Sequence, residues 1–470
     1  MRSFSLLLLA LPATLAAQAP RAETPAALLD RGITRMGGEA QLRAVASVRL
    51  DLITQWLRTS FAEAPFTDMP SYEHNVELRD YRTPAWRNTR YFNPLSNVVG
   101  TVDVVRDTIA IRQVRRGAGA DPTWGPLNRA YVQERRELFA FAPERLLLGL
   151  REAPDLAARP DTTIDGEPHA RLAATLDGWP SETFIRRSDA LPRLVRFRAD
   201  ATDDFGLAPW AVHEVEFWYS NWAPVAPGVL LPRQRDVRRV GKPYKRMTVL
   251  QATISAEAPA DSFAVSDSLA AAYLATERRA MWDAPLDGLA RVDRDAFAVM
   301  PPLTGSAGAV RIGGRWLVIE AAQATGAMQL LADWLGRHGG GAPIAGALAT
   351  NVWTGNGGVP WFTGRDLPVH AAPGAAATLA RINGGLKGIT LVNSPRWIRV
   401  GNDSLWLEPV DVPDFRGSMI AYAPSLRWLW LPFAGIPAHA ADQAAIIARL
   451  ERRGLAVELI GGQRAIVSAR

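Results

Sequence analysis

The sequence lacks cysteine and is poor in histidine and lysine, and each shortage excludes a class of site. Without cysteine the chain has no disulfide framework, no thiolate nucleophile and no cysteine-ligated zinc or iron–sulfur site. Its six histidines are spread from His74 to His439, and no two are close enough in sequence to form a local metal-ligand pair. Nearly all of the 53 basic residues are arginine, because only three lysines are present.

The basic residues do not form a nucleic-acid patch. The net charge is +6, but the arginines are scattered and often have acidic neighbours, as in the Glu134–Glu137 stretch. This pattern is typical of a solvated surface of mixed charge, so no nucleic-acid partner is expected.

Length and composition indicate folded domains. The chain has 470 residues, of which 48% are hydrophobic and 21% charged, and such a balance supports buried cores and excludes disorder as the main state. At roughly 150 residues per domain, two domains are expected.

The N-terminus has the parts of a secretory signal peptide. Arg2 precedes a short apolar run, Phe4–Leu11, and small residues follow it, with cleavage open after Ala16, Ala17 or Ala19. The run is too short to span a membrane, for which about 20 residues are needed, and no lipoprotein cysteine follows. We therefore expect residues 1–19 to be removed, and the mature protein to be periplasmic or secreted, without a transmembrane segment.

Residues 20–265 are predicted to form a large antiparallel β-sheet domain. One helical stretch, Pro25–Val45, is interrupted by Gly37 and Gly38, and only strands are expected after it. Turn signals such as Asp165-Gly166 separate these strands. The predicted strands cover 48–57, 75–78, 98–111, 170–176, 183–185, 194–198, 213–222, 228–236 and 246–255.

A linking helix and an α/β domain are expected after the sheet. Residues 266–288 contain the cap Ser266 and a helix from Leu269 to Trp282, with the domain boundary near Asp283. In 289–470 strands alternate with helices, predicted at 327–337, 375–382 and 440–453. The fold class is therefore α+β in two domains, with helices outside two sheets in the second.

The second half resembles the metallo-β-lactamase superfamily in the order of its segments. The strand Trp316–Ala321 contains Glu320 near its end, and a helix then leads to a second strand, Pro343–Thr350. In the superfamily this second strand enters a loop of the form His-x-His-x-Asp-His. The resemblance implies an N-terminal β-rich domain followed by an αββα sandwich of metallo-β-lactamase type.

The metal ligands implied by this resemblance are missing. Asn351, Trp353, Gly355 and Asn356 stand at the ligand positions of the loop, and Asp414 stands where a later histidine is expected. Catalytic zinc needs about three protein ligands, and asparagine and tryptophan do not supply them. We expect no zinc and no other cofactor, and we regard Asn351, Trp353, Asn356 and Asp414 as candidates to line a vacated site that Trp353 fills.

Other catalytic patterns were also considered. The sequence contains no Gly-x-Ser-x-Gly elbow and no phosphate-binding glycine loop. A serine triad could still assemble in space around His370 or His439, but surface or supporting roles are favoured for both. The paired acids Asp203-Asp204, and Asp161 with Asp165, are favoured as loop caps.

The sequence therefore predicts an exported protein that is a degenerate member of this superfamily. We expect it to have no catalytic activity and to bind a ligand or a partner. The expected occupant is a small apolar ligand or an envelope protein. Two alternatives stay open: a hydrolase with a reduced or atypical metal site around Asn351, Asn356 and Asp414, and a purely structural envelope module.

Overall fold

The computed structural model describes most of the chain, with several gaps. The described residues are 23–58, 69–91, 99–114, 121–127, 130–200, 212–226, 228–255, 258–259, 261–275, 290–299, 308–321, 325–351, 356–413, 415–462 and 466–468. The predicted signal peptide, the boundary near Asp283, and the candidates Trp353 and Asp414 lie outside them. No helix of these ranges has the length and apolar character of a membrane span.

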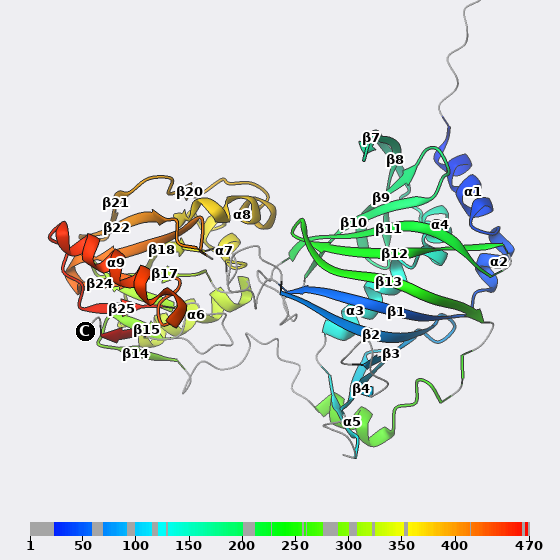
Figure 1. The fold of residues 1–470 in the computed structure, drawn as a ribbon, viewed down its shortest axis with the longest axis horizontal. Helices are drawn as coiled ribbons and strands as arrows, with labels where there is room; N and C mark the ends of the chain where they lie inside the picture. The colour runs from blue at the N-terminus through cyan, green and yellow to red at the C-terminus, as the bar shows by residue number, and fades with distance from the viewer. Residues whose placement is uncertain are drawn as a thin grey trace, which may run out of the picture.

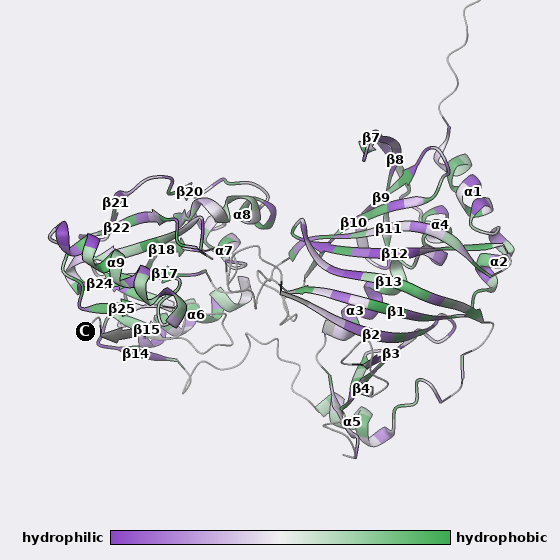
Figure 2. Cartoon of the chain, viewed as in Figure 1, coloured by the Kyte–Doolittle hydropathy of each residue, from purple (hydrophilic) through white to green (hydrophobic). Residues whose placement is uncertain are grey.

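The N-terminal part is built on one 13-stranded antiparallel sheet, which confirms the predicted antiparallel β architecture. Its strand order is β6-β5-β4-β3-β2-β1-β13-β12-β11-β10-β9-β8-β7, so every neighbour is a hairpin partner except the central pair β1 and β13. Hydrophobic and hydrophilic residues alternate along many of these strands (Figure 2). The strands are Ser47–Arg58 (β1), Met69–Asp80 (β2), Ala85–Tyr91 (β3), Val99–Arg106 (β4), Ile109–Val114 (β5), Thr123–Pro126 (β6), Ala157–Ile164 (β7), Glu167–Leu176 (β8), Trp179–Arg186 (β9), Pro192–Asp200 (β10), Val212–Ala226 (β11), Val229–Arg239 (β12) and Lys242–Ser255 (β13).

In the part of the chain that the structure describes, five α-helices accompany this sheet, and Figure 1 shows how they are arranged around it. The predicted helical stretch is present as two helices, because Gly37 and Gly38 both have positive φ and the chain turns there. Two further helices, α3 and α4, lie on one face of the sheet, where the sequence predicted only strands. The five are Pro25–Arg35 (α1), Glu39–Ala44 (α2), Ala130–Ala140 (α3), Pro143–Glu152 (α4) and Asp267–Ala275 (α5).

The C-terminal part contains two mixed sheets. A seven-stranded sheet has the order β14-β15-β16-β17-β18-β19-β20, and a six-stranded sheet runs from β21 to β26 in order. The strands are Arg291–Asp293 (β14), Phe297–Val299 (β15), Gly308–Ile312 (β16), Arg315–Ile319 (β17), Ile344–Ala349 (β18), Val369–Ala371 (β19), Ile389–Leu391 (β20), Arg396–Val400 (β21), Asp403–Val410 (β22), Ser418–Ala423 (β23), Trp428–Trp430 (β24), Leu459–Gly461 (β25) and Ile466–Ser468 (β26).

These two sheets pack face to face, with helices outside them. Leu317 and Ile319 of β17 meet Leu407 of β22 and Met419 of β23 in one buried cluster between the sheets. The opposite faces of β17 and β18 pack on the helices of a second cluster. The helices are Thr325–His338 (α6), Val359–Thr363 (α7), Ala376–Asn383 (α8) and Ala440–Arg452 (α9).

Helix α8 contacts the N-terminal sheet through residues that the structure describes. Arg381 of α8 forms an ion pair of 3.1 Å with Glu214 of β11, and Val240 packs against Ile382. The Arg381 guanidinium fills the space that a Cβ at Gly241 would need, with its nearest atom 2.4 Å from that position.

Candidate functional sites

Two of the residues at the predicted metal-loop positions, Asn351 and Asn356, lie around the carboxyl group of Glu320. Strands β17 and β18 are parallel neighbours, so the residues that follow them, Glu320 and Thr350, lie at the same edge of the sheet. Glu320, Asn351 and Asn356 are all buried. Glu320 and Asn356 both have positive φ, a conformation uncommon outside glycine.

Four donors surround the Glu320 carboxyl. Its Oε1 accepts from the Thr350 backbone N–H at 3.2 Å, from the Thr350 hydroxyl and from Asn351 Nδ2 at 3.0 Å. Its Oε2 accepts from Asn356 Nδ2 at 3.1 Å. The Trp430 ring N–H donates to the Thr350 hydroxyl oxygen at 2.9 Å, so the Thr350 O–H is left to donate to Glu320. The network is complete without any group from outside the chain.

All of these partners are neutral, and this decides the ionisation of Glu320. Burial raises the pKa of Glu320 to about 8, against the hydrogen bonds from Thr350 and Asn356, which lower it. Within the described ranges, no basic side chain forms an ion pair with Glu320 that would favour its charged form.

The residues at this position do not fit a zinc ion. Asn351 and Asn356 both point an amide nitrogen at Glu320, and the Asn356 oxygen accepts from the Ala321 N–H at 3.2 Å. An amide N–H is a donor and cannot coordinate a cation. Within the described ranges, no three His, Cys, Asp or Glu residues are grouped in a way that could hold a metal ion.

The two histidines considered for a triad lie apart from this network. His439 is buried against the rings of Phe415 and Phe433, and its Nδ1 lies 3.2 Å from Asp442. His370 of β19 is largely buried, and burial lowers the pKa of its ring.

A second polar site lies on the face of the N-terminal sheet that α3 covers, and it was missed in the sequence. Along β2, Asn75, Glu77 and Arg79 are buried, whereas Val76 and Leu78 between them are only half-buried. The inward face here is therefore the polar one, opposite to the usual alternation.

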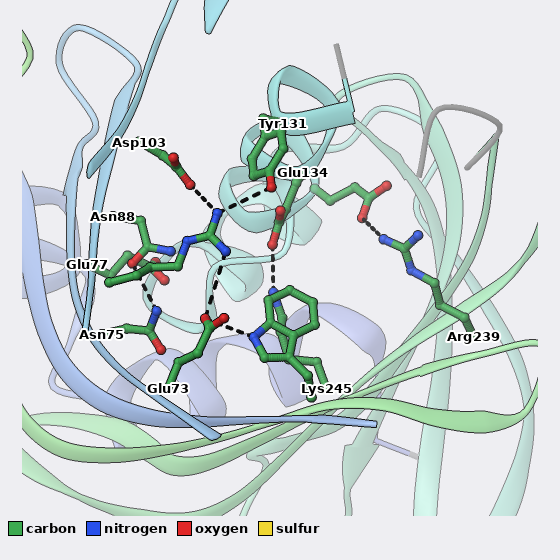
Figure 3. Close-up of polar contacts among 12 residues, drawn as sticks. Glu73, Asn75, Glu77, Asn88, Asp103, Tyr131, Glu134, Arg239 and Lys245 are labelled. Carbon is green, nitrogen blue, oxygen red and sulfur yellow. Dashed lines mark hydrogen bonds and ion pairs between the residues drawn. The ribbon is translucent and has the colours of Figure 1, made fainter. Parts of the chain in front are cut away.

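The cations of this site are held by acids from neighbouring strands and from α3 (Figure 3). Asp103 of β4 pairs with Arg90 and, at 2.5 Å, with Arg112. Lys245 of β13 donates to Glu134 of α3 at 2.6 Å and lies 4.9 Å from the ring centre of Trp56. Within the Glu134–Glu137 stretch, Glu137 is buried and Glu134 is half-buried, so the prediction of a solvated surface was wrong for these two acids, whereas Arg136 between them is exposed.

The two acids of α3 respond differently to burial. Burial opposes ionisation of Glu134, but the charges of Lys245, Arg239 and Arg90 outweigh it and lower the pKa of this carboxyl. Burial raises the pKa of Glu137, whose nearest cation, Arg239, is 3.7 Å away.

A small cavity remains between α3 and the sheet. Its volume is about 20 Å³, enough for roughly one water molecule. Three of the side chains that line it carry polar atoms with no hydrogen-bond partner among the described residues: Asn75 Oδ1, Trp86 Nε1 and Arg90 Nε. An ordered water that bridges them would satisfy this geometry.

The larger cavity is an open cleft at the end of the N-terminal sheet. Its volume is about 870 Å³, and its lining comes from the end of α1, the β7–β8 turn, the β9–β10 connection and the β11–β12 hairpin. Asp165, predicted as a loop cap, lies in the β7–β8 turn on the cleft wall.

Comparisons with known proteins give only distant likenesses. No family model and no curated protein matches the sequence. Among solved structures, a LolA superfamily protein from Nitrosomonas europaea has a TM-score of 0.31 and 12% identity, over 52% of this chain and 98% of that one. The metallo-β-lactamase FIM-1 from Pseudomonas aeruginosa has a TM-score of 0.27 and 17% identity, over 34% of this chain and 77% of that one.

Proposed function

We propose that this chain is an exported, non-catalytic binding protein whose C-terminal part has a metallo-β-lactamase-like αββα arrangement without a metal centre. The observation that carries this proposal is the use of Asn351 and Asn356 as donors to the buried Glu320. In this arrangement the side chains of Asn351 and Asn356 stabilise the fold and offer no ligand to a cation.

Each segment of the chain has a role in this proposal. Residues 20–265 are the binding part, 266–288 the linker and 289–470 the scaffold. We further propose, from the sequence alone, that Trp353 fills the space of the missing metal; Asp414 alone would be too few ligands to hold one.

The bound molecule in this proposal is polar. The cavity beneath α3 and the open cleft are both lined with charged and amide side chains. Beneath α4, the sheet face is filled by the protein's own apolar side chains, including Phe141, Leu147 and Phe197. These features favour a polar ligand over the apolar one that the sequence suggested.

Metal analysis combined with a hydrolase assay tests the proposal. We expect purified protein to contain zinc well below one equivalent and to hydrolyse neither β-lactam nor ester substrates. Stoichiometric zinc that is lost together with activity in Asp414→Ala would overturn the proposal in favour of a reduced metal site. Asp411→Ala is the matched control, because Asp411 is a nearby acid whose side chain is 85% exposed.

A further inference from the structure

The open cleft carries charges that cancel within its walls. Arg186 pairs with Asp189 at 3.0 Å and with Glu167 at 3.4 Å, and Arg193 pairs with Asp165 at 2.8 Å. A third arginine, Arg35, is exposed at the end of α1, so the lining holds three arginines and three acids. The cleft thus offers many donors and acceptors but no net charge to attract a phosphate or an ammonium group.

Apolar surface lies beside these polar pairs. Trp222 is half-buried in the wall, with its ring centre 6.4 Å from that of Tyr219, and Leu191 and Leu230 also contribute to the lining. A partly exposed indole beside paired polar groups offers a flat surface on which C–H groups of a ligand can pack.

A buried histidine in the same lining has an unused acceptor. His169 is 1% exposed, and its Nδ1 lies 2.8 Å from the carbonyl oxygen of Glu167. A carbonyl only accepts, so Nδ1 carries a proton, and in the tautomer protonated there alone Nε2 is an acceptor. Nε2 has no hydrogen-bond partner among the residues that the structure describes.

From these observations we propose that the cleft binds a neutral, hydroxyl-rich small molecule of the saccharide class. Sugar hydroxyls accept hydrogen bonds from guanidinium groups and donate hydrogen bonds to carboxylates. The C–H face of a sugar ring can pack on the indole of Trp222. The cleft volume lies within the range of small-molecule sites, roughly 300–1,000 Å³. This inference rests on the proposed binding function and adds the site and the ligand class to it.

Calorimetric titration of the full-length mature protein tests the inference. The probes are maltose, cellobiose, lactose and N,N′-diacetylchitobiose, with glucose 6-phosphate as a charged comparison. We expect at least one neutral disaccharide to bind with a dissociation constant of about 1 mM or tighter. Arg193→Ala and Trp222→Ala should each weaken this binding by about tenfold.

Matched variants outside the cleft control for indirect effects. Arg246→Ala removes a similar surface ion pair, with Asp236 at 3.1 Å, and Trp397→Ala removes a 49% exposed indole. Both should leave sugar binding unchanged. Binding that survives Arg193→Ala and Trp222→Ala, or no binding by any of the four disaccharides, would overturn the inference. A protein that contains no zinc and binds no sugar would refute only the saccharide site, whereas zinc-dependent hydrolysis would refute the proposed function.

Discussion

Glu320 and Glu134 are glutamates held in the interior by opposite means. Glu320 receives hydrogen bonds from neutral hydroxyl, amide and backbone groups, and its pKa rises to about 8. Glu134 lies beside Lys245, and its pKa falls although burial opposes the charge. For these two carboxyl groups, hydrogen bonds from neutral donors do not offset the lost hydration, whereas the charge of Lys245, with those of Arg239 and Arg90, does.

Removing the Glu320 side chain should have the largest effect. Glu320→Ala leaves four donor groups of Thr350, Asn351 and Asn356 without their acceptor and opens a cavity. We expect the free energy of unfolding to fall by about 4 kcal/mol in urea denaturation at about pH 4.5, where the contribution of Glu320 is full. Glu458→Ala is the control, because its pair with Arg427 is more than half exposed and should contribute less than about 1 kcal/mol.

The pH dependence of stability should differ between the two glutamates. Glu320 binds its proton more tightly in the folded state, so its contribution to stability is full below about pH 4.5 and is lost as the pH rises to about 8. The stability difference between wild type and Glu320→Gln should change by about 1.4 kcal/mol per pH unit in that window. A difference that stays constant from pH 5 to pH 8 would contradict the raised pKa.

For Glu134 the sign is reversed. Its folded-state pKa is lowered, so its contribution is present above the ordinary glutamate pKa and is lost as the pH falls. Lys245→Met should remove the cation and destabilise the protein by about 2–3 kcal/mol at pH 7. The double variant with Glu134→Gln should recover most of this loss, and additive effects in the cycle would show that the two groups are not coupled.

Substitution of Glu137 should have the smallest effect on stability. It can be compared directly with substitution of Glu134, which lies on the same helix. Burial raises the pKa of Glu137, so its charge contributes less than that of Glu134. Glu137→Gln should cost less than about 1 kcal/mol at pH 7 and less than Glu134→Gln in parallel denaturation experiments. A larger loss for Glu137→Gln would show that its pair with Arg239 matters more than its 3.7 Å separation suggests.

The sequence predicted much of the fold because local patterns determine it. The central antiparallel strands, α6, β17 and β18 were all expected from alternation and helical spacing, and the structure confirms them. Helices α3 and α4 were not predicted. The inward acids of α3 look like surface residues in the sequence, and the short apolar run of α4 does not distinguish helix from strand.

Of the candidate site residues that the structure describes, the sequence singled out only those that follow a strand. Glu320 was recognised as an acid near the end of β17, and Asn351 and Asn356 were named as residues of the loop after β18, but their bonds to Glu320 were not foreseen. The cluster around Lys245 was missed because alternation along β2 shows two faces without showing which one a distant helix covers. Trp353 and Asp414 remain predictions.

The contact at Gly241 has a consequence for how this sequence can vary over evolution. Since the guanidinium of Arg381 occupies the place of a Cβ at position 241, any larger residue there would displace the arginine from Glu214. The residues at positions 214, 241 and 381 should therefore co-vary among homologues. A homologue that has lost the glycine is expected to have changed the arginine as well.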